Sequence, residues 1–412
     1  MAAETGVRRV AAAAALLVIG LVVSGCASGG ASGAAVSPSA SASAGARTVT
    51  ADPGALRARF ESLATELGVP GAAMLVRTPQ GEITATYGVT QRHGSTPVSL
   101  DDHVRIGSNT KTMTGTVILQ LVQEGRISLT DKVGKYRPDV PNGSRITIEQ
   151  LLTMRSGLAN YTTTLELNKA LDTQSQRAWN PEELVAMGLA EPPTFAPGDG
   201  WNYSNTNTVL LGLIAEQLEN KPLAEIFQER LFTPLGLRET SYPAADDASL
   251  PEPYSHGYMY STNVDTMESS ALPPDQLAQA KAGTLLPSDT TNLNPSWAGA
   301  AGAGISTIRD LAHWVEALGS GAVLGPTLQK ERLASVQPVP VALPDPKYGW
   351  GIAKIGPLYG HTGELPGYNS FMGYDPVQKV TIVVWTNLAP AADGRPPAAT
   401  IATSLMTSIY GG

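Results

Sequence analysis

The 412-residue chain has the composition of a globular protein, with 42% hydrophobic and 16% charged residues. This length suffices for one large domain or two medium ones, with a core that needs no disulfide or metal. The formal net charge is −8, so there is no basic excess to bind phosphates, and we expect no nucleic-acid partner. A single Cys, and five His without an HxH or HExxH pattern, argue against a protein-built metal site. We therefore expect neither a metal ion nor a cofactor.

The first residues have the features of an export signal. Arg8 and Arg9 precede an apolar run, residues 10–23, that is short for a membrane span but has the length of a signal-peptide core. Residues 1–25 are therefore predicted to be a signal peptide. The sequence Val23-Ser24-Gly25-Cys26 resembles the lipobox of bacterial lipoproteins, which implies a lipid on Cys26 and an anchor at the outer face of the cell membrane. The alternative is an ordinary secretory signal with an unmodified Cys, and the export route stays open.

Residues 26–53 are predicted to be the lipidated Cys and a flexible tether. From 27 to about 47 the sequence is almost wholly Ala, Ser and Gly, which have too little apolar bulk to offset the entropy of ordering them. A flexible coil of about 25 residues spans roughly 25–30 Å root mean square. From residue 54 the pattern becomes globular without any repeat, and residues 54–412 are predicted to form one folded domain.

Strand-like segments lie near both ends of this domain, and helices are expected between them. Residues 72–77 and 83–87 flank the turn Pro79-Gln80-Gly81, and further β-rich runs cover 348–355, 370–374 and 380–385. Helices are predicted from the Thr147 capping box to Ser156-Gly157, from Asn180-Pro181 onward, over 209–218 and over 397–410. One sheet assembled from both termini around a helical insertion is an α+β architecture.

The first candidate motif is Ser108-Asn109-Thr110-Lys111, which opens an apolar helix with Gly125 as its C-cap. A spacing of three places the Ser108 hydroxyl and the Lys111 amine on one helix face, close enough for the amine to take the hydroxyl proton. The helix N-terminus adds a partial positive charge that favours anionic states of a reaction. The simpler interpretation is an N-cap Ser with a solvent-facing Lys.

Two further motifs follow along the chain. In Tyr203-Ser204-Asn205 a phenol and an amide two residues apart project the same way if the segment is extended, although Ser204 or Asn205 would also serve as a helix cap. His361-Thr362-Gly363 lies among the C-terminal strands, where a Gly lets a ligand approach a strand edge closely. Taken alone, His361 is equally compatible with a structural role.

In this order, the three motifs resemble the S-x-x-K, Y-x-N and K/H-T-G motifs of the serine β-lactamase and D-alanyl-D-alanine carboxypeptidase superfamily, in its class C-like branch. The resemblance covers nearly all of the predicted domain. It implies a β-lactamase/transpeptidase-like fold, with an antiparallel sheet built from N- and C-terminal strands, flanking helices and a helical insertion.

The resemblance also implies roles for the motif residues. Ser108 would be the acylated nucleophile, Lys111 and Tyr203 the proton-transfer pair, and Asn205 an orienter of Lys111 and of the substrate amide. For Lys111 to act as a base near neutrality, its pKa must fall by roughly three units through burial and nearby positive charge. His361, Thr362 and Gly363 would lie along the substrate, and the oxyanion hole would be the backbone N–H groups of Ser108 and Glu364.

Two departures from the family pattern bear on specificity. His361 replaces the more frequent Lys, so a fixed cation for a substrate carboxylate is lost and any charge there is expected to depend on pH. Glu364, if it points into the cleft, would repel the terminal carboxylate of a D-Ala-D-Ala peptide and favour neutral esters or amides. A rival S-x-N, Ser261-Thr262-Asn263, is interpreted as loop.

Three hypotheses for the function follow. The first is a cell-envelope serine hydrolase acylated on Ser108 by a β-lactam or a D-Ala-D-Ala-type peptide from peptidoglycan. The second is an esterase or other amidohydrolase on the same scaffold, motivated by His361 and Glu364. The third is a non-catalytic cell-wall-binding lipoprotein. The sequence leaves the acyl donor and the oligomeric state open.

Overall fold

The computed structural model describes residues 49–411, so the predicted signal peptide 1–25, Cys26 and most of the predicted tether lie outside the described residues. The folded domain begins earlier than predicted. The Thr50 N–H donates to the Ile409 carbonyl over 3.2 Å, and the Asp52 carboxylate accepts from the Ala55 N–H at the start of helix α1 (Pro53–Glu66). Within the described part, no helix has the length and apolar character needed to cross a membrane.

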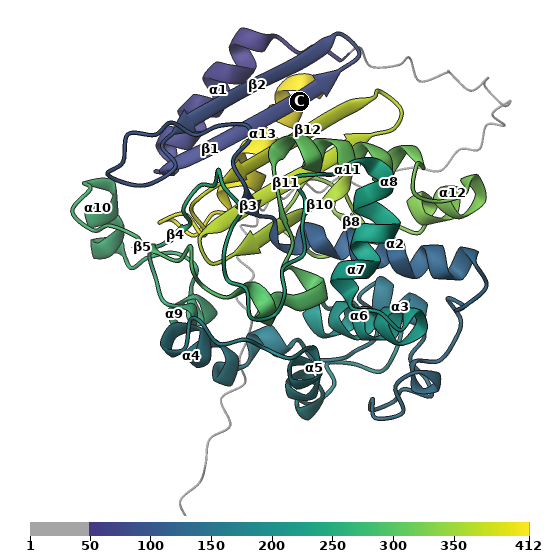
Figure 1. Ribbon diagram of the computed structural model, residues 1–412. Helices are drawn as coiled ribbons and strands as arrows, with labels where there is room; N and C mark the ends of the chain where they lie inside the picture. The colour runs from purple at the N-terminus through teal and green to yellow at the C-terminus, as the bar shows by residue number, and fades with distance from the viewer. Residues whose placement is uncertain (1–48, 412) are drawn as a thin grey trace, which may run out of the picture. The chain divides into compact units, whose positions relative to one another are not determined.

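An eight-stranded antiparallel sheet joins the two ends of the domain, in the order β2-β1-β12-β11-β10-β9-β8-β7 (Figure 1). β1 is the first strand of the domain and pairs with the last strand, β12, so that Met74 lies opposite Val384. The strands are β1 (Gly71–Thr78), β2 (Gly81–Gly88), β7 (Gln337–Pro338), β8 (Lys347–Tyr348), β9 (Ala353–Ile355), β10 (Leu358–Leu365), β11 (Tyr368–Asp375) and β12 (Val380–Thr386). The prediction of one sheet built from N- and C-terminal strands is confirmed.

Helices cover both faces of this sheet (Figure 1). Successive side chains of a strand point to opposite faces, and in β1 both sets are buried. Met74 and Val76 pack in the apolar cluster of α1 and the C-terminal helix α13 (Pro397–Tyr410), whereas Leu75 packs in the larger cluster that includes α11 (Ile308–Ser320). The helix predicted over 397–410 is confirmed.

The segment between β2 and β7 is mainly helical, as predicted. Its α-helices are α2 (Thr110–Gln123), α3 (Ile148–Leu152), α4 (Leu165–Thr173), α5 (Pro181–Ala190), α6 (Asn205–Glu219), α7 (Leu223–Phe227), α8 (Thr233–Leu235), α9 (Asn263–Glu268), α10 (Pro274–Lys281), α11 and α12 (Pro326–Ala334). Shorter helical turns are η1 (Gly107–Asn109), η2 (Val133–Lys135), η3 (Tyr161–Thr163), η4 (Gln228–Phe232) and η5 (Pro295–Ala301), and the small strands are β3 (Val104–Arg105), β4 (Tyr258–Met259), β5 (Ser288–Asp289) and β6 (Ile305–Ser306).

The predicted starts of α3, α5 and α13 are confirmed, α6 begins at Asn205 rather than 209, and the end of α3 differs. Thr147 forms the expected capping box with Gln150, and Asn180 caps α5. Helix α3 ends at Leu152 instead of reaching Ser156, because Met154 has a left-handed backbone with φ of 61° that an α-helix cannot accommodate.

Two glycines bring the sheet into direct contact with the turn before α2. A methyl group at Gly107, which has φ of +53°, would lie 2.5 Å from the Glu364 backbone nitrogen, and one at Gly363 would lie 2.0 Å from the Ile106 carbonyl oxygen. Since real side-chain carbons do not approach other atoms this closely, only glycine fits at either position. The end of β10 thus lies against the residues around Ser108.

Candidate active site

Ser108 and Lys111 lie together at the start of α2. Ser108 is in η1, half-buried, and lines a cleft of about 380 Å³. The Lys111 side chain lies in the first turn of α2, and its Nζ is 2.9 Å from the Ser108 Oγ. The residue is only 1% exposed, so the interpretation of a solvent-facing Lys is wrong.

The surroundings of the Lys111 amine favour its neutral form. Its Nζ donates to the Asn205 Oδ1 over 2.6 Å and to the Ala301 carbonyl over 2.8 Å, and neither partner is charged. Burial lowers the pKa of Lys111 well below its usual range. A neutral amine has two N–H donors and one lone pair. With both donors used, the lone pair remains to accept the hydrogen of the Ser108 hydroxyl.

Asn205 is held in place by Thr162 in η3 and by Asn160, the residue before η3. Its Nδ2 donates to the Thr162 Oγ1 over 3.0 Å, and its backbone N–H donates to the Asn160 Oδ1 over 3.0 Å. Ser204 precedes α6 but its hydroxyl donates to the Ala159 carbonyl and makes no capping bond to the helix. The interpretation of Ser204 and Asn205 as mere helix caps is therefore wrong. The amide oxygen of Asn205 is turned toward Lys111.

Tyr203 covers the Lys111 amine on the cleft side. The Lys111 Nζ lies 4.8 Å from the centre of the Tyr203 ring. Burial raises the pKa of Tyr203 above its usual range, and a hydrogen bond with Ser108 acts in the opposite direction. The phenol therefore keeps its proton at neutral pH. A neutral amine and a protonated phenol beside one hydroxyl can remove a proton from that hydroxyl and supply one to a departing group.

His361 lies on β10 and is 3% exposed. Its Nδ1–H donates to the Thr362 carbonyl, and its Nε2 accepts from the Tyr348 hydroxyl over 3.2 Å. Burial, followed by the charge on Lys111, lowers the pKa of His361 to about 3, and the bond to Thr362 opposes the shift. The charge of His361 is therefore expected to change with pH only well below neutrality. His361 presents a neutral ring to the site.

Glu364 is solvent-exposed and is one of the residues that line the cleft. Its Oε2 accepts from the Asn369 Nδ2 over 2.8 Å, and the Asn369 Oδ1 in turn accepts from the Ala398 and Ala399 N–H groups in the first turn of α13. Protein atoms around the carboxyl raise its pKa above the usual range, and contact with water limits that rise. The cleft therefore carries an acidic group beside the nucleophile.

Next to Ser108, one edge of β10 has no paired strand among residues 49–411. β10 pairs with β11 along Tyr359–Leu365 but with β9 only up to Gly360. The Ser108 N–H lies in a first helical turn, where backbone donors have no intrahelical acceptor. The Glu364 backbone nitrogen lies close to Gly107, the residue before the nucleophile, and the role of the Ser108 and Glu364 N–H groups as oxyanion donors stays a prediction.

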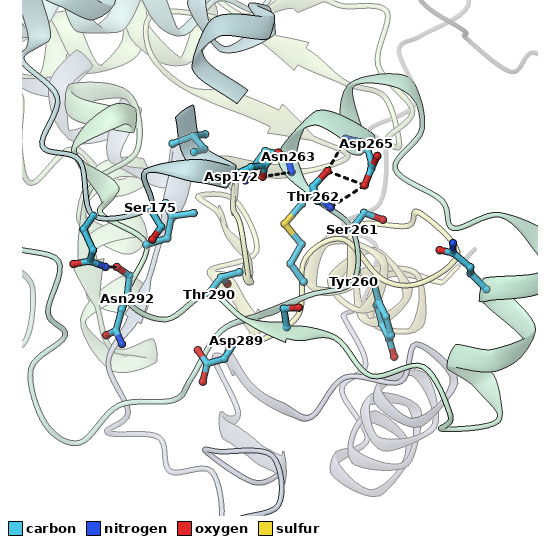
Figure 2. A pocket seen from close by; sticks show the side chains of 16 residues that line it. Asp172, Ser175, Tyr260, Ser261, Thr262, Asn263, Asp265, Asp289, Thr290 and Asn292 are labelled. Carbon is cyan, nitrogen blue, oxygen red and sulfur yellow. Dashed lines mark hydrogen bonds between the residues drawn. The ribbon is translucent and has the colours of Figure 1, made fainter. Parts of the chain in front are cut away.

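The rival motif Ser261-Thr262-Asn263 is not a loop throughout. Thr262 caps α9 in a capping box with Asp265, and Asn263 donates from its N–H and its Nδ2 to the Asp172 Oδ1 over 2.7 and 2.8 Å. Figure 2 shows these bonds in a polar cavity of about 490 Å³ next to the cleft. Asn263 also lines the cleft. Its amide serves to join α4 and α9, and it makes no contact with Ser108 or Lys111 among the hydrogen bonds of the described residues.

Some groups at the site carry no sequence signal. The Ala301 carbonyl, the Thr162 hydroxyl and the Tyr348 hydroxyl each bond to a motif side chain from elsewhere in the chain. A backbone carbonyl has no residue type to reveal it, and Thr and Tyr are common. In the span 49–411, no three His, Cys, Asp or Glu side chains gather as metal ligands would.

The same arrangement of sequence and fold is found in known proteins. A family model described as Beta-lactamase matches residues 56–405. Protein flp of Staphylococcus aureus (strain MW2) is 27% identical over 329 residues, which is 78% of this chain, and the chain spans only 60% of that relative's length. Esterase EstB of Burkholderia gladioli is 29% identical over 218 residues, 49% of this chain and 54% of the esterase.

Among solved structures, a D-stereospecific amidohydrolase from Streptomyces sp. superposes with a TM-score of 0.73 at 30% identity, covering 88% of this chain and 99% of that one. The fold class predicted from the sequence is confirmed by this likeness and by the antiparallel sheet with its helical insertion. Since the family model spans most of the chain, the resemblance inferred from the three motifs is confirmed as well. The chain belongs to the Beta-lactamase family.

Proposed function

We propose that the protein hydrolyses esters or amides with uncharged leaving groups, through an acyl-enzyme on Ser108. The observation that carries the proposal is the buried Lys111 amine, 2.9 Å from the Ser108 hydroxyl and bonded only to neutral groups. A Ser hydroxyl is a weak nucleophile until a base takes its proton, and this amine is placed to do so.

In the first half-reaction, the Ser108 oxygen forms a bond to the substrate carbonyl carbon and its proton passes to the Lys111 amine. The Ser108 and Glu364 N–H groups stabilise the oxyanion. Losing one such donor typically costs about 2.7–4 kcal/mol of transition-state stabilisation. Tyr203 gives its proton to the departing oxygen or nitrogen as the carbonyl–heteroatom bond breaks, and it regains a proton from Lys111.

In the second half-reaction, water attacks the acyl-enzyme. The Lys111 and Tyr203 pair takes the water proton, the carbonyl carbon forms its bond to the water oxygen, and the bond to Ser108 breaks. The Ser108 oxygen regains a proton and the carboxylic acid is released. Each group thus returns to its starting protonation state.

The preference for uncharged leaving groups rests on the charges along β10. His361 stands where a fixed cation would bind a substrate carboxylate, and it is neutral. Glu364 adds an acidic group on the same cleft. An anionic peptide terminus beside His361 would therefore lose its hydration without a compensating cation. The names of two relatives, an esterase and a D-stereospecific amidohydrolase, support ester and amide chemistry.

A second candidate is acylation by a β-lactam or a D-Ala-D-Ala-type peptide of peptidoglycan. The completeness of the three motifs and the free edge of β10 favour it, because an extended peptide can add to such an edge. For the whole protein we also propose export and a lipid anchor at Cys26, on the sequence alone. A bacterial cell-envelope location would give access to either class of substrate.

The test follows the intact mass of the purified protein after mixing with a chromogenic aryl ester or with a penicillin, beside Ser108→Ala. We expect ester turnover that Ser108→Ala abolishes, with little penicillin adduct. A persistent Ser108-dependent penicillin adduct with no ester turnover would establish the second candidate instead. Turnover that survives in Ser108→Ala would overturn both, and absence of any adduct or turnover would favour the non-catalytic lipoprotein.

A further inference from the structure

A second cavity, about 300 Å³ and mostly apolar, lies on the other side of Tyr203 from the cleft. Its lining includes Trp201, Val339, Val341, Leu343 and Tyr348. We propose that this cavity is the leaving-group pocket and that it accepts an apolar, uncharged alcohol or amine, such as an aromatic one. This inference rests on the proposed function and adds the chemical class of the leaving group to it.

The first observation that supports the pocket is its position along β10. His361 and Thr362 line the apolar cavity, whereas Glu364 and Leu365 line the cleft, so the free edge of one strand leads from one to the other. Ser108 lies against the strand between them, as the close approach at Gly107 shows. A substrate extended along this edge places its scissile bond at Ser108 and one part in each cavity.

The departing atom must adjoin Tyr203, which can give it a proton and which lies between the two cavities. The other residues that line each cavity therefore indicate which part of the substrate leaves. The neighbours of Tyr203 in the apolar cavity are aromatic, with ring centres 6.4 Å away in Trp201 and 6.2 Å away in Tyr348. The cleft side instead presents the amides of Asn160 and Asn205, which suit the polar groups of an acyl part.

The wall opposite Tyr203 is a loop in which Val339 packs with Met154 and Tyr348, whereas the side chain of Val341 stays partly exposed to water. Residues 339–346 join β7 to β8, and the loop is closed by a hydrogen bond from the Val339 N–H to the Pro346 carbonyl over 3.0 Å. Val341 is 38% exposed, which is unusual for a large apolar side chain in this protein. An apolar group bound between this loop and the aromatic side chains would remove that surface from water.

The charges around the cavity exclude an anionic leaving group. Among the described residues that line it, Lys347 is the only cation, and its Nζ is paired with Asp345 at 3.1 Å. His361 is neutral and buried. A carboxylate placed here would be desolvated without a free positive partner, whereas an aromatic ring would meet three aromatic side chains.

The experiment compares esters of one acyl group with alcohols of similar acidity: methanol, 1-butanol, benzyl alcohol and 4-(hydroxymethyl)benzoate. All four form the same acyl-enzyme, so differences in kcat/KM report the leaving-group side alone. We expect kcat/KM to rise about 10-fold or more from the methyl to the benzyl ester, and to fall by a similar factor when the ring carries the carboxylate. Equal kcat/KM for all four would overturn the pocket while leaving the proposed function intact.

Two variants test whether the preference for a benzyl leaving group arises in the apolar cavity. Val341→Asp is expected to lower the benzyl-to-methyl ratio of kcat/KM at least about threefold. The matched control is Val377→Asp, an exposed Val (81% exposed) away from both cavities, which should leave the ratio unchanged. If Val341→Asp instead alters preference among acyl groups with a fixed alcohol, the assignment of the two cavities is reversed and the proposal is refuted. If no ester acylates Ser108 by intact mass, the proposed function itself fails.

Discussion

Replacing Gly107 with Ala tests whether the contact between η1 and β10 sets the geometry of the site. Gly107 has φ of +53°, a conformation that costs an L-residue about 1–2 kcal/mol. The added methyl group would lie 2.5 Å from the Glu364 nitrogen, about 0.9 Å short of ordinary contact at 3.4 Å, and overpacking of this kind costs about 1–3 kcal/mol more. β10 must therefore move by nearly 1 Å relative to Ser108, a misplacement that typically lowers the rate about 100-fold.

The assay combines ester turnover per folded molecule with urea unfolding. The matched control is Gly125→Ala at the other end of α2, where φ is +71° but no atom lies within 4 Å of the added methyl group. We expect Gly125→Ala to lose about 1–2 kcal/mol of unfolding free energy and to keep its turnover. Gly107→Ala should lose both. A Gly107→Ala protein that is destabilised but turns over esters within about twofold of the unmodified chain would refute the reasoning.

Three further predictions follow from individual side chains. Asn205→Asp places a carboxylate beside Lys111, so the pKa of the amine rises by about 1–3 units and the ascending limb of the kcat/KM pH profile moves to higher pH; an unmoved limb would contradict Lys111 as the base. In the folded state the pKa of His361 is lowered to about 3, whereas in the unfolded chain it is about 6.5, so the free energy of unfolding falls as the pH drops through this window, by roughly 2–3 kcal/mol at pH 4.5. Urea unfolding at pH 7 and 4.5 should show that loss shrink in His361→Asn and persist in the exposed control His313→Asn. Cys26→Ala should abolish labelling by a radioactive fatty acid, and a labelled variant would place the lipid elsewhere.

The fold could be predicted from the sequence where local residues by themselves specify a turn or a helix start. Pro79-Gln80-Gly81 sits between two alternating apolar runs, and the hairpin of β1 and β2 forms there. Asn180-Pro181 likewise specifies both the cap and the first residue of α5. The end of α3 was not predictable in the same way, because the left-handed turn at Met154 depends on what surrounds it rather than on its own type.

The residue types of the candidate site were also visible, but their electrostatic states were not. The spacing of Ser108 and Lys111 places them on one helix face, yet it does not tell whether that face is buried. The neutral state of His361 results chiefly from burial, which no motif encodes. The apolar cavity depends on loop 339–346 folding back against Trp201, a tertiary event without a local signal.

The base strength of Lys111 is a property of its whole environment. A buried ammonium could be stabilised by a carboxylate, but that partner would raise the pKa of the amine and remove the base. Here Asn205 and the Ala301 carbonyl satisfy the two N–H donors without adding charge. Thr162 holds the side-chain amide of Asn205, and Asn160 holds its backbone N–H. The exposed Glu364 carboxylate accepts a hydrogen bond from Asn369 instead. A neutral Lys111 amine activates Ser108, but it offers no fixed cation to an anionic substrate terminus. Activation of the nucleophile and selection of an uncharged leaving group therefore both follow from the uncharged surroundings of Lys111.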